Sequence, residues 1–421
     1  MSRYGKTNEM RAFSDYRGRG SLIFGLFVVL LSACGLQTTT PTPEVITEMA
    51  IIQVSENAPI ESATSIPSET AIPVASASPE VVPSETLDPG ENPLTGLVVE
   101  NEKLLDRRPI SVKITLYPRS NRPQWGLSFA DIVYEYYHNN NLTRFHAIFY
   151  GQNADLAGPI RSARLPDEHL METYGSVLTY ASADSRIRDA LNNRYPTWRL
   201  ISILEGICPP NPVCRYDPEA YNHLLANTAL LSNYVDAQGG DNNAPDLAGM
   251  NFSDQKPKSN YEVERVYTWY SASAYNYWEY QSGPRNYVRY QDAWDAVGGR
   301  EELYVVLTDR LNNEAITAEN VVVLFVDHFH TVYVPASGGV PETEVVDIDF
   351  RGRGPAYAFR NGLAYELEWS RGSGEMLKLA FEDGTPYDFK PGNTWFQVVS
   401  DSSSLDQDGE NWTFMFDFPK P

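Results

Sequence analysis

Residues 132–150 read IVYEYYHNNNLTRFHAIFY, and this stretch predicts a β-hairpin. Two runs of β-branched and aromatic side chains, Ile132–Tyr137 and Arg144–Tyr150, flank the Asn-rich segment His138–Asn141. Such runs favour strands, and asparagines favour the tight turn that joins them. We therefore expect two adjacent antiparallel strands in the first ordered part of the chain.

The residues around this hairpin predict a mixed α/β domain over residues 93–235. Pro166 followed by Asp167 and Glu168 is the pattern of a helix start, and Asp184 is a suitable N-cap for a second helix. The expected elements are a strand at Ile110–Leu116, a helix from Pro166 to Gly175, a strand at Val177–Ala181 and a helix at Asp184–Asn192.

Strand patterns dominate the second half of the chain. Residues 236–260 are rich in Gly, Asn, Asp and Pro and are predicted to form a linker. Residues 261–401 predict a mostly antiparallel β domain with a single helical turn at Ile316–Asn320, and residues 402–421 are expected to be a C-terminal tail. The expected fold class is therefore α+β, an N-terminal α/β domain followed by a β-rich domain.

The first 33 residues have the pattern of a signal peptide. Basic residues precede the apolar run Leu22–Leu31, which is shorter than the roughly 20 residues of a membrane-spanning helix. The run ends in Leu31-Ser32-Ala33-Cys34, which resembles the lipobox of bacterial lipoproteins. The resemblance implies cleavage after Ala33 and acyl chains on Cys34 that hold the protein on the outer face of the cell membrane. An ordinary secretory signal with an incidental cysteine is the alternative.

Composition restricts the remaining classes of protein. Residues 34–92 are rich in Ser, Thr, Pro and Glu and predict a disordered stalk, with a short strand at Ile51–Val54 as the alternative. The 421 residues include 33 Lys and Arg against 55 Asp and Glu, and this net charge of −22 argues against nucleic-acid binding. Three cysteines exclude a disulfide-dense scaffold.

Strings of sequence in both predicted domains match those of a known family. They are NPLTG (92–96), RPI (108–110), RPQWGLSFADIVYE (122–135), TRF (143–145), GPIRSAR (158–164), NVVV (320–323), DID (347–349), GRG (352–354) and PGNTW (391–395). The chain thereby resembles the YerB-like bacterial lipoproteins, a two-domain family of uncharacterised function. The resemblance implies a lipid-anchored envelope protein and supplies no reaction. The chain departs from the family's pattern at Tyr180–Ser185 and at Tyr221-Asn222-His223.

The strongest candidate site is a group of arginines in an otherwise acidic chain. Arg161-Ser162-Ala163-Arg164 stands just before the predicted helix start, and Arg144 lies on the predicted hairpin. Guanidinium groups and a helix N-terminus together favour a carboxylate or phosphate, so we predict an anion pocket. Alternatively, Arg161 and Arg164 pair internally with Asp131, Glu135 or Asp184, and Asp131 and Glu135 are included among the candidate site residues.

Histidines and cysteines give weaker signals. Tyr221-Asn222-His223 could supply a general base, His223, although a lone histidine is more often structural. His328 and His330 would share one face of a strand, but no third metal ligand stands at a recognisable spacing, and we expect neither a metal nor another cofactor. Cys208 and Cys214 predict a disulfide outside the cytoplasm, with reactive or metal-bound thiols as the alternative.

Residues 261–290 hold many Tyr and Trp side chains, including Trp269 and Trp278. Exposed rings would suit stacking on sugars or a protein partner, whereas a sheet packed on the first domain would bury them. We therefore expect an envelope binding or assembly protein for a wall glycan, an anionic polymer or a protein partner, tethered to the membrane through Cys34. An envelope enzyme with His223 as base is the second interpretation, and a purely structural protein the third.

Overall fold

The computed structural model describes residues 88–202, 208–216, 223–333 and 343–418. The predicted signal peptide, Cys34, the predicted stalk up to residue 87, and Tyr221 and Asn222 lie outside these residues. The described residues fall in one compact unit. Within them, each helix is too short or too polar to cross a bilayer.

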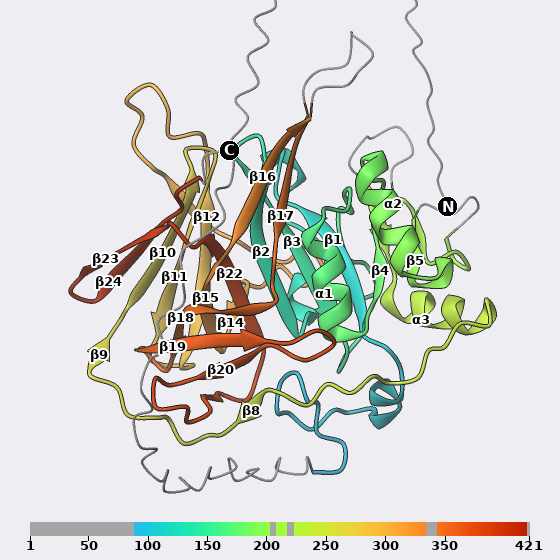
Figure 1. The fold of residues 1–421 in the computed structure, drawn as a ribbon, viewed down its shortest axis with the longest axis horizontal. Coiled ribbons are helices and arrows are strands. Elements are labelled where there is room, and N and C mark those ends of the chain that lie inside the picture. The colour runs from blue at the N-terminus through green and yellow to red at the C-terminus, as the bar shows by residue number, and fades with distance from the viewer. Residues whose placement is uncertain (1–87, 203–207, 217–222, 334–342, 419–421) are drawn as a thin grey trace, which may run out of the picture. The chain divides into compact units, whose positions relative to one another are not determined.

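This unit is built mainly from strands, arranged in two large sheets and three small ones (Figure 1). The eleven-stranded sheet has the spatial order β20 (Lys378–Ala380), β19 (Leu363–Arg371), β18 (Gly352–Arg360), β15 (Asn320–Val326), β22 (Thr394–Ser400), β2 (Ile132–Asn139), β3 (Leu142–Phe149), β1 (Ile110–Thr115), β4 (Val177–Thr179) and β5 (Leu200–Ile201), with β9 (Tyr261–Glu262) beside β19. The seven-stranded sheet has the order β13 (Tyr304–Val306), β12 (Asn286–Asp292), β11 (Ala274–Gln281), β10 (Arg265–Ser271), β24 (Asn411–Met415) and β23 (Ser404–Asp408), with β14 (Thr317–Ala318) beside β12.

The smaller elements connect and flank these two sheets. The two-stranded sheets pair β16 (His328–Tyr333) with β17 (Thr343–Ile348), β21 (Asp388–Phe389) with β8 (Asn251–Phe252), and β6 (Val213–Arg215) with β7 (Leu224–Ala226). The helices of the described residues are α1 (Pro166–Tyr174), α2 (Ser185–Arg194) and α3 (Thr228–Ala237), with the short 3-10 helices η1 (Glu102–Asp106), η2 (Arg119–Asn121), η3 (Leu127–Phe129) and η4 (Thr197–Arg199).

The predicted hairpin is present as β2 and β3, near the middle of the large sheet. Asn139 pairs with Leu142, so the turn consists of Asn140 and Asn141, at φ 53° and 59°. Two consecutive residues of positive φ make the type of turn that matches strand twist, and asparagine tolerates this backbone region better than most residues. The Asn-rich segment therefore fixes the register of the hairpin.

The alternation of side chains on the hairpin gives the large sheet two different faces. Tyr136 on β2 lies opposite Arg144 on β3 and faces α1, whose Asp167 it contacts. The neighbouring Glu135 points to the other face and binds Arg289 of the seven-stranded sheet. The large sheet is thus packed between α1 on one side and the second sheet on the other.

The local signals for the two predicted helices are confirmed. Pro166 stands at the start of α1, with Asp167 in the first turn, and Gly175 ends the helix at φ 58°. A Cβ at Gly175 would lie 2.6 Å from Pro245 Cβ, which adds a steric reason for glycine there. Asp184 caps α2, its carboxylate accepting a hydrogen bond from the backbone N–H of Arg186 at 3.1 Å.

The large sheet contains strands from both predicted domains (Figure 1). β22 lies between β15 and β2 and runs parallel to both, so Thr394 is opposite Ile132 on one side and Asn320 on the other. The sheet is therefore continuous across the predicted linker at 236–260, while the domain boundaries themselves remain predictions.

The fold is mainly β, which corrects the expected α/β character of the N-terminal part. The described helices are short, and the parallel strands β1, β4 and β5, with α1 and α2 between β4 and its neighbours in the chain, occupy only one end of the large sheet. The antiparallel hairpin β2–β3 and the strands of the second half of the chain make up the rest of that sheet, so strands outweigh helices. The helical turn expected at Ile316–Asn320 was wrong: Thr317–Ala318 form β14, paired with Tyr287 and Val288. Residues 404–415, within the expected tail, form the hairpin β23–β24, and β24 extends the second sheet beside β10.

Candidate functional site

The structure brings together the arginines that the sequence singled out. Arg144, on β3, donates from Nη1 to the carbonyl oxygen of Ser162 at 2.5 Å. Arg164, just before α1, donates from Nη1 to the carbonyl of Ala163 at 2.9 Å. Burial, followed by the charges of Arg164 and Arg161, lowers the pKa of Arg144 well below its usual value. Three positive charges therefore share one partly buried corner between the sheet and α1.

Directly beneath them lies a buried polar group centred on Asp167. Its Oδ1 accepts a hydrogen bond from Lys113 Nζ at 3.1 Å, lies 2.8 Å from His146 Nδ1 and also accepts from the hydroxyl of Tyr136. Its Oδ2 accepts from the backbone N–H of Arg164 at 2.7 Å. The side chains of Lys113, His146 and Asp167 have no exposed surface. Asp167 thus holds the start of α1 against the sheet.

Electrostatics within this group favour a charged carboxylate. Burial lowers the pKa of Lys113 to about 7, although the charge of Asp167 opposes the shift. Burial alone would raise the pKa of Asp167, but Lys113 and the hydrogen bond from His146 hold it below its usual value. We name Lys113, Arg144, Arg161, Arg164 and Asp167 the basic cluster.

Asp131 and Asp184 do not neutralise the arginines through direct contact. Asp131 accepts hydrogen bonds from Asn92 Nδ2 at 2.7 Å and from the backbone N–H of Tyr150 at 2.6 Å. Asp184 caps α2 and pairs with Arg186 at 2.8 Å, so its charge reaches Arg164 only from a distance. These two acids have structural roles of their own.

Glu135 lies on the opposite face of the sheet from the basic cluster. It pairs with Arg289 at 2.6 Å, and both side chains are fully buried between the two sheets. Among the residues described, Arg144 and Arg164 have no carboxylate within ion-pair distance. For Arg164, the internal pairing expected as an alternative is therefore absent from the described part of the chain.

His138 adds an unsatisfied polar atom next to the cluster. It is the last residue but one of β2, is 4% exposed, and its Nδ1 has no hydrogen-bond partner within the described ranges. Burial and the charges of Arg144 and Arg164 lower its pKa well below the usual value, so the ring is neutral. A neutral imidazole can donate or accept one further hydrogen bond at this position.

Sequence reasoning missed Lys113, Tyr136, His138, His146 and Asp167. Lys113 and His146 are directly opposite each other on β1 and β3. A signal was present, because a lysine inside ISVKITL and a histidine inside RFHAIF interrupt apolar runs. Only the register of β1 and β3 shows that Lys113 and His146 lie on the same face of the sheet.

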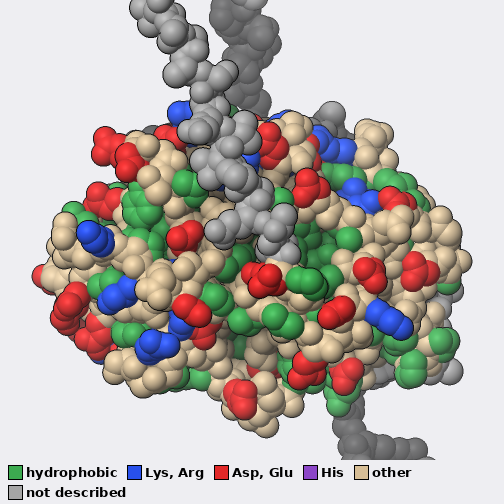
Figure 2. All heavy atoms as spheres, turned by 90° about the horizontal axis from the view of Figure 1, so that it is seen from below, with side chains coloured by type: hydrophobic (Ala, Val, Ile, Leu, Met, Phe, Trp, Pro, Cys, Tyr) green, Lys and Arg blue, Asp and Glu red, His purple; other side chains and the backbone are tan. Residues whose placement is uncertain are grey.

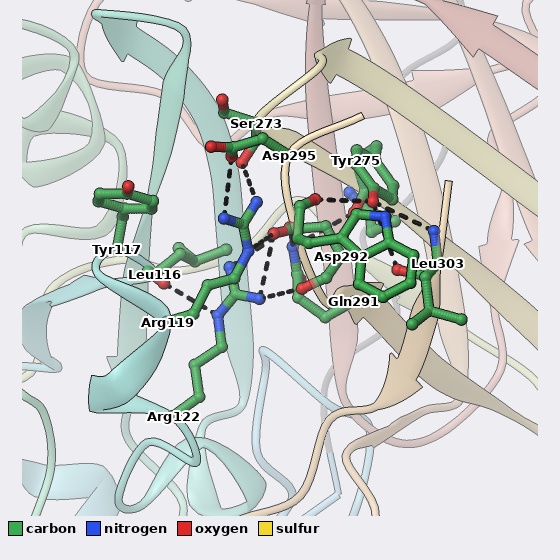
Figure 3. Close-up of polar contacts among 12 residues, drawn as sticks. Leu116, Tyr117, Arg119, Arg122, Ser273, Tyr275, Gln291, Asp292, Asp295 and Leu303 are labelled. Atoms are coloured by element: carbon green, nitrogen blue, oxygen red, sulfur yellow. Dashed lines mark hydrogen bonds and ion pairs between the residues drawn. The ribbon is translucent and has the colours of Figure 1, made fainter. Parts of the chain in front are cut away.

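A second arginine group gives an instructive contrast (Figure 3). Arg119 pairs with Asp292 at 2.6 Å and with Asp295 at 2.9 Å, and Arg122 pairs with Asp292 at 3.2 Å. The carboxylates converge on the two guanidinium groups, and Arg122 also donates to the carbonyl of Leu116 at 2.9 Å. Here the arginines are neutralised, and the network joins η2 to the end of β12.

The aromatic residues of β10–β12 divide between the two faces of their sheet. Trp278 is fully buried and packs on Trp395 with ring centroids 5.0 Å apart, so for this residue the structure has the buried arrangement, one of the two that the sequence left open. Trp269 is half-buried on the outer face. There, Tyr277 and Tyr290 stack on each other at 4.5 Å, so their ring faces are occupied within the sheet. This arrangement weakens the case for a sugar-stacking platform.

His223 immediately precedes β7, which lies beside the segment Gly158–Ile160 that leads to Arg161. The carbonyl of the next residue, Leu224, accepts from the backbone N–H of Ile160 at 2.7 Å. The His223 ring lies edge-on to Trp125, 6.3 Å away, and its Nδ1 is buried without a hydrogen-bond partner among the described residues. A role for His223 as a base stays a prediction.

The remaining predicted positions are separate from the cluster. Cys208 and Cys214 form a disulfide, with Cα atoms 6.1 Å apart, in agreement with their spacing. His328 Nδ1 is 2.7 Å from the carbonyl of Val326, and His330 lies 2.5 Å from Glu344. The described ranges contain no group of three or more His, Cys, Asp or Glu that could hold a metal ion.

Comparisons with known proteins agree with this architecture. The N-terminal domain model of a family described as protein of unknown function DUF3048 matches residues 94–207, and the C-terminal domain model of the same family matches residues 266–396. The chain therefore belongs to this two-domain bacterial family of unknown function.

A similar protein from Bacillus subtilis can be compared with this chain in both sequence and structure. The chain is 28% identical over 319 residues to a protein named "Putative lipoprotein YerB", covering 73% of this chain and 86% of the relative. The crystal structure of the YerB protein has a similar fold, with a TM-score of 0.58 and 24% identity, covering 73% of this chain and 96% of that one. Residues 94–207, which the N-terminal family model matches, include the strands that carry the basic cluster.

Proposed function

We propose that this chain is a lipid-anchored envelope protein whose basic cluster binds an anionic group, carboxylate or phosphate, of an extracytoplasmic polymer. The lipobox at Cys34 and the name of the similar Bacillus protein support the anchoring. The geometry around Arg144 and Arg164 supports the binding role.

The observation that carries the proposal is the lack of a direct counter-charge for Arg144 and Arg164 among the described residues. Removing a charge from water costs several kcal/mol unless an opposite charge or full hydrogen bonding compensates it. Asp167 is already engaged by Lys113 and His146. A bound anion would supply the missing negative charge, and this favours anion binding at the cluster.

The chemistry of the cluster also limits the ligand. Guanidinium groups offer paired N–H donors that match the oxygens of carboxylate and phosphate. Figure 2 shows Asp and Glu side chains spread over the face that it draws, and the net charge of the chain is −22. An anionic polymer is therefore repelled by the protein as a whole and held only where local positive charge is concentrated.

Co-sedimentation of the full-length protein with purified cell-wall material tests the proposal. The variants Arg144→Gln and Arg164→Gln should each weaken binding about tenfold, and added salt should weaken wild-type binding further. Arg353→Gln is the matched control, because this guanidinium is 75% exposed on β18. Repeating the experiment with wall material from which phosphate polymers have been removed shows whether the bound group is a phosphate or a carboxylate. Equal sedimentation of all three variants would refute the proposal.

An envelope enzyme is the second candidate function. The buried, unpartnered Nδ1 of His223, within the described residues, favours it, because such an atom is available to a ligand or a water. In that case purified wall polymer should release products with wild-type protein and not with His223→Ala. The absence of product release at high protein concentration would exclude it.

A further inference from the structure

A cavity of about 480 Å³ lies between η1, α3 and the loop of residues 240–243. Its lining includes Arg107, Asn153, Asp106, Asn242 and Asp236, and no residue of the basic cluster. Most of its lining side chains are polar, so a ligand here would be recognised through hydrogen bonds and charge.

Arg107 is the buried charge of this cavity. Arg107 is only 7% exposed, and its Nη2 donates a hydrogen bond to the amide oxygen of Asn153 at 2.8 Å. Within the described ranges Nε has no hydrogen-bond partner and no carboxylate lies within ion-pair distance. Burial lowers the pKa of Arg107, with the charge of Asp131 opposing from a distance. The guanidinium therefore lacks a direct counter-ion.

The neighbouring Arg108, in contrast, has its positive charge balanced by a carboxylate. Arg108 pairs with Asp241 Oδ2 at 2.7 Å and donates to the carbonyl of Gly175 at 2.9 Å. Asp241 lines the same cavity, but its charge is already used by Arg108. Arg107 is thus the buried cation to which an anionic ligand group could bind, whereas Lys103, the other cation of the lining, is exposed.

A carboxylate at the mouth of the cavity provides the opposite charge. Asp236 is exposed in the last turn of α3, where the helix dipole adds negative potential, and that turn contains no basic residue. Among the described residues Asp236 forms no ion pair. Asp106 also lines the mouth, but the exposed ammonium of Lys103 lies one turn earlier in η1. Asp236 is therefore the carboxylate best placed to attract a ligand cation.

We infer that this cavity binds a small zwitterion of the amino-acid or short-peptide class, with its carboxylate at Arg107 and its ammonium at Asp236. Amide groups such as those of Asn153 and Asn242 supply neutral hydrogen bonds between the two charges. The inference does not rest on the proposed function of the basic cluster, because the two sites share no residue.

Isothermal titration of the full-length protein with the dipeptide L-alanyl-L-alanine tests the inference. Two blocked forms, the C-terminal amide and the N-acetyl dipeptide, each remove one ligand charge and should bind at least about tenfold more weakly. Asp236→Asn should weaken the dipeptide similarly and leave the N-acetyl form unchanged. Asp254→Asn is the matched control, because Asp254 is exposed and outside the cavity.

The Arg107 end is tested with Arg107→Gln, which should weaken the dipeptide and leave the amide form unchanged. Because this side chain is buried, thermal unfolding is measured alongside, and Asp236→Asn carries the test if Arg107→Gln does not fold. Arg144→Gln should leave dipeptide binding intact, which separates this site from the basic cluster. No binding at millimolar dipeptide, or binding that is insensitive to Asp236→Asn, would overturn the inference.

Discussion

Arg144 donates from Nη1 to the carbonyl oxygen of Ser162 at 2.5 Å, so a largely buried guanidinium meets a neutral acceptor where a carboxylate would balance its charge. On the opposite face of the same hairpin, Glu135 and Arg289 form a fully buried ion pair at 2.6 Å. One hairpin therefore carries a neutralised charge on one face and an uncompensated one on the other. This asymmetry distinguishes the structural face from the candidate binding face.

The first prediction concerns the stability of the uncompensated face. Arg144→Met removes a buried charge without breaking an ion pair among the described residues, so the free energy of unfolding should be unchanged or rise by about 1 kcal/mol. Urea unfolding with and without phosphate measures this, and phosphate should stabilise the wild type but not the variant. A loss of more than about 2 kcal/mol without phosphate would mean that Arg144 is structural.

The second prediction concerns the neutralised face. Arg289→Met leaves Glu135 charged and buried without its partner, so the free energy of unfolding should fall by about 3–5 kcal/mol. Adding Glu135→Leu should restore much of that loss, because both charges are then absent. If the single variant costs less than about 1 kcal/mol in urea unfolding, the pair does not hold the two sheets together.

The third prediction follows from Asp131. Burial raises its pKa from 3.8 to about 6, although hydrogen bonds from Tyr150, Gly151 and Asn92 oppose the shift. The folded state then binds the proton more tightly than the unfolded state, so this group's contribution to stability is present below pH 3.8 and is lost as the pH rises through about 6.

The expected size of this effect is about 2 kcal/mol between pH 4 and 7. Urea unfolding of the wild type should show this decline with rising pH, and Asp131→Asn should remove it. Parallel pH profiles for the two proteins would show that Asp131 has an ordinary pKa.

Local signals account for what the sequence predicted well. The asparagine turn, Pro166, Gly175 and Asp184 are decided by residues within a few positions of each other, and each element is present. The position of β22 between β15 and β2 depends on pairings with residues far away in the chain. Periodicity carries no information of that kind.

The candidate site shows the same division between local and non-local information. Arg144, Arg161 and Arg164 were found because their charge is unusual in an acidic chain. Asp167 and Lys113 could not be placed beside them, because their contact depends on how α1 packs against β1. Burial of Trp278 likewise depends on the second sheet packing on the first.

The fourth prediction concerns the membrane anchor. Cys34, which lies outside the described residues, is expected to carry the acyl chains, so Cys34→Ser should abolish incorporation of a labelled fatty acid. The variant should also leave the membrane fraction of a producing bacterium. Cys208→Ser is a suitable control, because Cys208 is joined to Cys214 and should not affect labelling. Labelling that persists in Cys34→Ser would contradict the lipobox interpretation.

Isothermal titration of inorganic phosphate and of acetate into the full-length protein tests the central claim, anion binding at the basic cluster, most directly. We expect saturable binding of at least one of these anions, weakened at least about tenfold in the double variant Arg144→Gln, Arg164→Gln and unchanged in Arg353→Gln. Binding that is absent in the wild type, or equal in all three proteins, would contradict the claim.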